Sequence, residues 1–257
     1  KERGAEGVMG GTNHVPAAFL WPVDAHHVQA RRMRAQMDAA PPLVKRLWQA
    51  LVRAKIRQQA AALEARGLPG SGLIDMARRV RAGDPGNVEA QAARRYWPLL
   101  FGRDFRRDQD GGGTNALLNY GYAILRSATA RAVTAAGLHP SIGLFHANRG
   151  NPLCLVDDLM EPFRPFVDLA VLRLAEAGHG EVTREAKRYL ALIPSLDMAT
   201  AQGTTPIGTV LIRLAGSLAQ ALEDGEGSLA LPSLDHPWAP MPLEWPAPPP
   251  ADGGTPC

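Results

Sequence analysis

The spacing of apolar residues along the chain is mostly that of an α-helix with one buried face, with apolar positions three or four residues apart. Residues 43–67 give the clearest example of this spacing. Their regularly spaced apolar positions are Val44, Leu47, Trp48, Leu51, Val52 and Ile56. Gly67, followed by Leu-Pro-Gly-Ser-Gly, marks the end of the pattern. The segment is therefore predicted to be a long amphipathic helix.

The same period predicts further helices on both sides of this segment. Pro41 and Pro42 separate it from a preceding helix, and Asp84 with Pro85 is expected to form the N-cap and first position of another. The expected helices cover residues 28–40, 43–67, 73–81, 86–101, 114–136, 158–177, 183–193 and 206–222. Short extended segments are expected at residues 14–22, 139–146 and 152–156. The predicted fold class is mainly α: a multi-helix domain with short extended segments and a vestigial N-terminal β piece.

Composition changes this picture mainly at the C-terminal end. Nine of the 22 prolines fall within the last 30 residues, so residues 223–257 are expected to form an acidic, disordered tail. The two cysteines, Cys154 and Cys257, do not make a disulfide framework, and no signal peptide or membrane-spanning run is visible. A cytoplasmic protein with no membrane association is expected. Because the chain opens with Lys1 instead of Met, a fragment or an internal start is also expected.

The net charge of +3 is unevenly distributed. From residue 223 onward six acids occur without any lysine or arginine, whereas residues 26–60 hold eight basic residues and one acid. A cationic surface attracts polyanions, and nucleic acid is the commonest large polyanion. The candidates for phosphate contacts are Arg53, Arg57, Arg94 and Arg149. Arginine-rich solvated helix faces explain the same composition equally well, so both interpretations stay open.

Three residues far apart in the chain form a candidate metal site: Glu89, His146 and Glu161. Each also has a simpler explanation. Glu89 lies early in its helix, where an acid interacts favourably with the helix dipole, and His146 ends an apolar extended run. Asp158 and Glu161 fit a capping box at the start of the next helix. Taken together, two carboxylates and one neutral imidazole suit Mg²⁺ or Mn²⁺, and such an ion polarises a phosphodiester.

Long motifs in the same regions resemble the CRISPR adaptation integrases, the family of CRISPR-associated protein one. They are, in chain order, NVEAQAARRYW, NALLNYGYAILRSATARAVTAAGLHPSIGLFH and LVDDLMEPFRPFVD. Two upstream segments, LWPVDAHHVQARRMRAQ and KRLWQALVRAKIRQQA, resemble the branch of this family found in type II systems. The resemblance covers roughly residues 12–222.

The resemblance implies an enzyme, a metal-dependent DNA endonuclease and integrase that acts in spacer acquisition and antiviral defence. In that family a glutamate, a histidine and a second acid hold Mg²⁺ or Mn²⁺, and these positions correspond here to Glu89, His146 and Glu161. It also implies a homodimer bound to a small ferredoxin-like CRISPR adaptation subunit and to double-stranded DNA. Such a complex joins prespacer 3′-hydroxyl ends to the CRISPR repeat by transesterification.

The start of the chain departs from the family pattern, in which a β-rich N-terminal domain makes much of the dimer. Residues 1–22 are therefore interpreted as a remnant of that domain, residues 23–222 as the helical catalytic domain and residues 223–257 as the tail. Two other functions stay open. The chain could be a truncated DNA-binding remnant without catalytic activity because the dimerising domain is missing, or a helical scaffold whose acids only cap helices.

Overall fold

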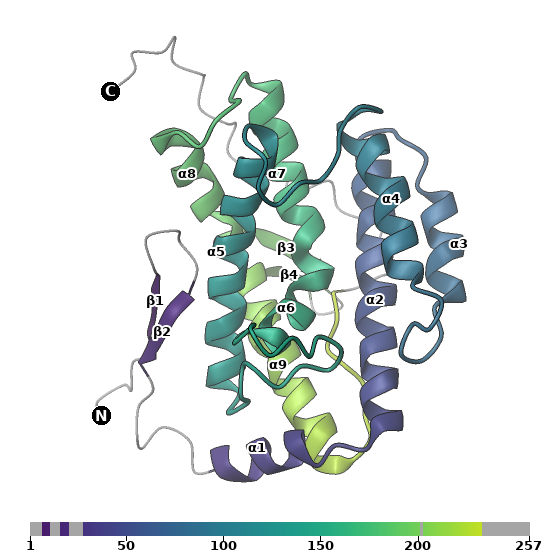
Figure 1. The fold of residues 1–257 in the computed structure, drawn as a ribbon, viewed down its shortest axis with the longest axis vertical. Helices are drawn as coiled ribbons and strands as arrows, with labels where there is room; N and C mark the ends of the chain where they lie inside the picture. Colours follow the sequence, from purple (N-terminus) through teal and green to yellow (C-terminus); the bar gives the residue numbers. More distant parts are fainter. Residues whose placement is uncertain (1–6, 11–15, 21–27, 201–202, 233–257) are drawn as a thin grey trace.

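The structure is a computed structural model that describes residues 7–10, 16–20, 28–200 and 203–232. Most of this part of the chain is helical, which confirms the predicted fold class (Figure 1). The α-helices are α1 (Gln29–Met37), α2 (Pro41–Glu64), α3 (Ser71–Arg79), α4 (Val88–Phe101), α5 (Thr114–Ala135), α6 (Cys154–Met160), α7 (Arg164–Glu176), α8 (Arg184–Ala191) and α9 (Ile207–Asp224). The remaining elements are short 3₁₀ helices and strands: β1 (Gly7–Gly10) and β2 (Pro16–Leu20) before α1, and η1 (Glu161–Phe163), η2 (Ile193–Ser195), β3 (Asp197–Thr200) and β4 (Gly203–Pro206) between later helices.

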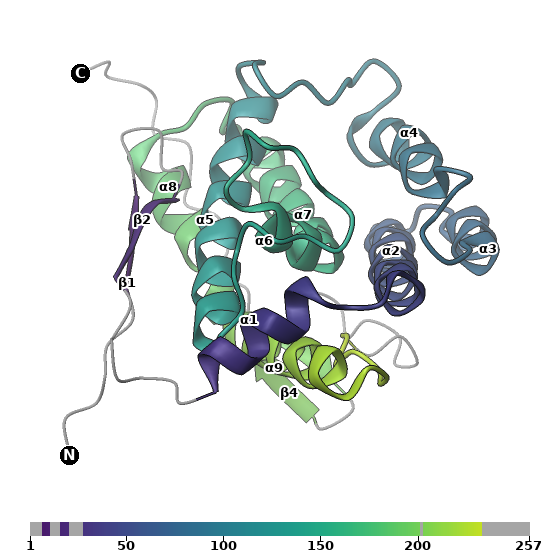
Figure 2. The same cartoon turned by 60° about the horizontal axis from the view of Figure 1, so that its bottom comes forward.

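Helix α2 joins two groups of helices that lie side by side (Figures 1 and 2). It packs against α3 and α4 on one side and against η1 and α7 on the other, while α5 packs against α6, α7, α8 and α9. The predicted apolar face of α2 is buried in this arrangement, with Trp48, Leu51 and Ile56 at most 1% exposed. Burial of such side chains stabilises the fold by roughly 1.5–3 kcal/mol each. The core therefore runs through both groups.

Two antiparallel hairpins accompany the helices. Strands β1 and β2 pair with Val8 opposite Phe19, and both strands pack against α5. The strand expected within residues 14–22 is thus present as β2. Strands β3 and β4 pair with Met198 opposite Thr205 and lead directly into α9. The sequence analysis did not predict this second hairpin.

The region between residues 139 and 177 differs from its prediction. The segment 152–156 is not extended, because α6 begins at Cys154, and residues 139–146 form turns and bends instead of a strand. Asp158 does not cap a helix, since it lies inside α6 and is fully buried. The predicted helix 158–177 is instead interrupted by η1, where Pro162 lacks the N–H that a continuous α-helix needs. The capping-box interpretation of Asp158 and Glu161 was therefore wrong.

The C-terminal boundary also differs in part. Helix α9 continues to Asp224, two residues into the segment expected to be a disordered tail, and residues 233–257 lie outside the described residues. Among the described residues, none of the helices combines the length and the apolar character that a bilayer-spanning segment requires.

Candidate active site

Glu89 of α4 and Glu161 of η1 meet at the side chain of Lys55 in α2. The Lys55 Nζ lies 2.5 Å from Glu89 Oε1 and 2.5 Å from Glu161 Oε2. The two carboxylate oxygens are therefore no more than about 5 Å apart, twice that distance. Two of the three residues proposed as ligands from the sequence thus converge on one positively charged point between the two groups of helices.

The backbone that carries Glu89 is fixed by side chains preceding α4. Asn87 is the N-cap residue and accepts a hydrogen bond from the N–H of Ala90, while Asp84 accepts from the N–H groups of Val88 and Glu89, both at 3.0 Å. Asp84 was predicted to be the N-cap itself. Asp84 instead lies three residues before the N-cap residue Asn87, in a left-handed conformation with φ of 46°, and stabilises the helix start from there.

Glu161 is 4% exposed and lies between two cations. Its Oε1 is 2.9 Å from Arg164 Nε, and its Oε2 contacts Lys55. Burial alone would raise the pKa of Glu161, but Arg164 and Lys55 together hold this pKa below its ordinary value. Burial likewise opposes the charge of Lys55, yet Glu161 and Glu89 raise the pKa of its ammonium above the ordinary value. The ion pairs therefore favour the charged forms of Glu161 and Lys55 against the cost of burial.

His146 lies on the segment that connects α5 to α6, within electrostatic range of Glu89 and Glu161. Its Nδ1 is 2.5 Å from Asp158 Oδ1, and its ring packs edge-on against Trp48 with 5.8 Å between centroids. The hydrogen bond with Asp158 raises the pKa of His146 despite partial burial, and the fields of Glu161 and Glu89 add to this. A carboxylate on Nδ1 also orients the ring so that Nε2 is the nitrogen left for a ligand.

These residues suit a divalent cation, although the described residues contain no ready-made cluster of three or more His, Cys, Asp or Glu side chains around one point. Two carboxylates already converge on one cation, the Lys55 ammonium. Hard oxygen donors of this kind are those that Mg²⁺ and Mn²⁺ prefer, and one imidazole is compatible with them. Glu89 and Glu161 are thus brought together, His146 is their neighbour, and Lys55 lies between the carboxylates.

Another buried acid, Asp168 of α7, lies close to this centre. It is 1% exposed, and it accepts hydrogen bonds from the hydroxyls of Tyr96, at 2.9 Å, and Tyr122. Burial raises the pKa of Asp168 to about 7, although both hydroxyls act in the opposite direction. The ring of Tyr122 also lies under the guanidinium of Arg164, 4.8 Å from its centroid.

Sequence reasoning missed Lys55, Arg164 and Asp168 as members of this site. Two signals could have found them. Lys55 is a charged residue on the buried side of an amphipathic helix, which is rare unless the charge is paired. Arg164 and Asp168 follow Glu161 at helical spacing, so that all three project from one side of the η1–α7 segment.

Of the four arginines considered for phosphate contacts, two are half-buried and two are exposed. Arg53 donates from Nη2 to the carbonyl oxygen of Val80 at 2.8 Å, so its guanidinium already has a structural partner. Arg57 is half-buried. Arg94 and Arg149 are exposed, and Arg149 lines a cavity of about 740 Å³ together with His146. Whether any of the four contacts DNA stays a prediction.

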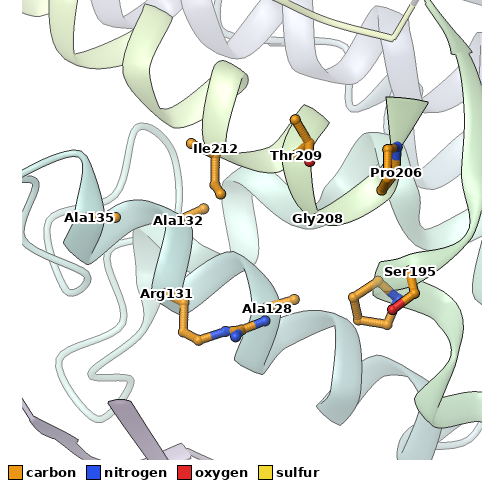
Figure 3. Close-up of a pocket in the computed structure, with 10 residues that line it drawn as sticks. Ala128, Arg131, Ala132, Ala135, Ser195, Pro206, Gly208, Thr209 and Ile212 are labelled. Atoms are coloured by element: carbon orange, nitrogen blue, oxygen red, sulfur yellow. The ribbon is translucent and has the colours of Figure 1, made fainter. Parts of the chain in front are cut away.

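A second cavity, of about 430 Å³, lies between α5, η2 and α9 (Figure 3). Small and apolar residues line most of it, and Arg131 supplies the charged side chain among those labelled in Figure 3. None of the residues of the candidate site lines this cavity.

Comparison with known proteins identifies the relatives of the chain. Residues 86–188 match the family model described as CRISPR associated protein Cas1. A CRISPR-associated endonuclease Cas1 from Neisseria meningitidis serogroup C (strain 8013) is 42% identical over 193 residues, which cover 74% of this chain and 63% of that protein. A CRISPR-associated endonuclease Cas1 1 from Thermus thermophilus is 35% identical over 196 residues, which cover 68% of this chain and 58% of that protein.

Solved structures share the fold. A casposase bound to integration product aligns with a TM-score of 0.71 at 20% identity, covering 90% of this chain and 76% of that one. A Cas1 protein from Thermotoga maritima aligns with a TM-score of 0.68 at 14% identity, covering 87% and 80%. The chain spans less than two thirds of the length of the two curated relatives described above. Over its matched part, the chain belongs to the Cas1 family.

Proposed function

We propose that the chain is a metal-dependent DNA endonuclease and integrase of CRISPR adaptation. It would join the 3′-hydroxyl ends of a prespacer to the CRISPR repeat by transesterification. The observation that carries this proposal is the convergence of Glu89 and Glu161, from separate segments, on one cationic point, with His146 within electrostatic range of both carboxylates. Membership of the Cas1 family supports it, since the Neisseria and Thermus relatives are named endonucleases.

Each residue of the site has a distinct task in this proposal. Glu89, His146 and Glu161 would hold Mg²⁺ or Mn²⁺, and the ion would supply polarisation of the phosphodiester and offset the charge on the leaving oxygen. Asp158 holds the His146 ring in place through Nδ1, so that Nε2 is presented to the ion. Arg164 keeps the buried Glu161 ionised and fixed.

The proposed partners follow from the family and from the charge of the chain. Arg149 and Arg94 are exposed, and with Arg57 and Arg53 they are the proposed contacts to the phosphates of double-stranded DNA. A homodimer is proposed from the resemblance to the family. A small ferredoxin-like subunit is proposed as well, because the fold matches a chain in a Cas6-RT-Cas1–Cas2 complex with a TM-score of 0.69. Action on genomic repeats would place the protein in the cytoplasm.

The proposal is tested by Mn²⁺-dependent strand transfer of a fluorescent duplex with free 3′ ends. Glu89→Ala, His146→Ala and Glu161→Gln should each reduce the rate beyond the roughly 10–100-fold loss typical of changes to outer-shell residues. Glu185→Gln, at an acid in the first turn of α8 and outside the candidate site, is the control and should keep the parent rate. Equal rates in all four variants would show that these residues are not catalytic. A parent that binds DNA but transfers no strand would favour the inactive remnant.

A further inference from the structure

The candidate site is electrically balanced by the protein alone. Glu89 and Glu161 contribute two negative charges, and Lys55 and Arg164 contribute two positive charges within ion-pair distance. The neighbouring His146 has its own partner in Asp158, and Asp168 is bonded to two tyrosine hydroxyls. A divalent cation that joins this set leaves an excess of two positive charges in a largely buried space. Its binding is therefore opposed until a negative group arrives or a cation leaves.

The two cations of the site differ in how firmly they are held. The guanidinium of Arg164 lies over the ring of Tyr122, and its Nε is within ion-pair distance of Glu161, so two separate contacts hold it. Lys55 is the cation that contacts both proposed ligands, and its ammonium is a point charge on a flexible stem. Lys55 is consequently the group that is able to give way, whereas Arg164 stays with Glu161.

We propose that Lys55 is a positioning residue that makes ion binding at this site depend on DNA. In the free protein its ammonium holds Glu89 and Glu161 together. When a phosphodiester of DNA enters, Lys55 pairs with it, and the carboxylates become available to the ion. The single negative charge of the phosphodiester removes one of the two excess positive charges. This inference rests on the proposed function, because it takes Glu89 and Glu161 to be metal ligands.

Linkage of this kind has a measurable size. Coupling between two ligands typically changes affinity by about 5- to 150-fold, and each ligand changes the affinity of the other by the same factor. Mn²⁺ binding to the full chain is followed by the electron paramagnetic resonance signal of free Mn²⁺, with and without a short duplex. The parent should bind Mn²⁺ at least about 5-fold more tightly when the duplex is present. Mn²⁺ should tighten duplex binding, followed by fluorescence anisotropy, by the same factor.

Substitution of the lysine separates this linkage from general electrostatics. Lys55→Met should bind Mn²⁺ more tightly than the parent in the absence of DNA, and the effect of the duplex should shrink to less than about 3-fold, below the usual range of coupling. Lys45→Met is the matched control, since Lys45 is an exposed lysine near the start of the same helix. It should behave as the parent does. Lys55→Arg keeps the charge and should keep part of the linkage.

The outcomes distinguish this inference from the proposed function. If the parent binds Mn²⁺ equally well with and without the duplex, and Glu89→Ala abolishes that binding, the linkage is wrong and the metal site stands. If the parent binds no Mn²⁺ in either condition, or Glu89→Ala binds as the parent does, the metal site itself is wrong. Should Lys55→Met fail to fold, as judged by circular dichroism, the parent and Lys55→Arg decide the question. If the duplex does not change the Mn²⁺ affinity of the parent, that result is sufficient to refute the inference.

Discussion

Asp158 illustrates how one buried carboxylate can determine the position of a functional side chain. Its oxygens accept hydrogen bonds from the backbone N–H groups of Leu144, at 2.6 Å, and Phe145, at 3.1 Å, as well as pairing with the His146 ring. The loop approaches so closely that a methyl group at Gly143 would lie 2.9 Å from Asp158 Oδ2. An irregular segment therefore carries His146 in a defined place, because the carboxylate satisfies N–H groups that no strand or helix pairs.

Asp168 gives a prediction about the pH dependence of stability. Burial raises its pKa to about 7 in the folded chain, from an ordinary value of 3.8. Between these values the folded state holds a proton that the unfolded state has released, so the free energy of unfolding should fall as pH rises from about 4 to about 7 and level off above. The slope that one such group contributes is on the order of 1 kcal/mol per pH unit.

Urea unfolding of the parent and of Asp168→Asn at several pH values measures this contribution. The asparagine stays neutral, so the free energy of unfolding of the variant should lack this decline. The stability of the variant relative to the parent should therefore rise with pH. Asp75→Asn, at a carboxylate that pairs with Arg78 on the surface, is the control and should keep the parent profile. If the parent and Asp168→Asn show parallel profiles, Asp168 is ionised in the folded chain throughout this range.

At the scale of elements, the sequence predicted helices well and irregular segments poorly. Helix α2 could be predicted because its buried face repeats over many turns, whereas a single buried carboxylate decides the course of residues 139–153. Strands β3 and β4 have the sequences Asp-Met-Ala-Thr and Gly-Thr-Thr-Pro, which show no regular alternation of apolar and polar positions. Their pairing depends on the neighbouring α9, which local pattern does not reveal.

The contact between α5 and α7 gives a prediction at this scale. A methyl group at Gly121 would lie 2.5 Å from Val167 Cγ1, and valine is stiff about its first side-chain torsion. Gly121→Ala should therefore lower the free energy of unfolding, typically by about 1–3 kcal/mol, although alanine favours helices. Gly216 in α9 has open space around it, so Gly216→Ala should raise that free energy by about 0.5–1 kcal/mol.

The two glycine variants control each other, because both replace a helical glycine with alanine. Urea unfolding monitored by circular dichroism compares them with the parent. A gain in stability at both positions would show that α5 and α7 separate easily to admit the methyl group. A loss at both would mean that the open space beside Gly216 is filled in solution.

At the scale of the whole molecule, the site joins segments from both groups of helices, and this limits what the sequence could reveal. Glu89, His146 and Glu161 could be proposed as a set because their residue types suit one ion and their motifs resemble one family. Lys55 lies 34 residues before Glu89, and no local pattern connects them. Its role becomes visible when α2 packs against α4 and η1. The packing of α2 against α3 brings Arg53 to the carbonyl oxygen of Val80, a structural role that its sequence neighbourhood did not indicate.

The distribution of exposed arginines leads to a prediction about DNA binding by the whole molecule. Arg149 is exposed and lines the cavity that His146 also borders, so a phosphate held at the site would pass near it. If Arg149 contacts a phosphate, Arg149→Ala should reduce the slope of log affinity against log salt by about one unit, because one fewer counterion is released. Fluorescence anisotropy of a labelled duplex between 50 and 200 mM salt, the range over which such contacts are usually compared, measures the slope.

Arg184→Ala, at an exposed arginine at the start of α8, is the matched control and should leave the slope unchanged. Equal slopes for parent and Arg149→Ala would remove Arg149 from the DNA-binding surface, and equal losses in both variants would indicate only a general effect of net charge.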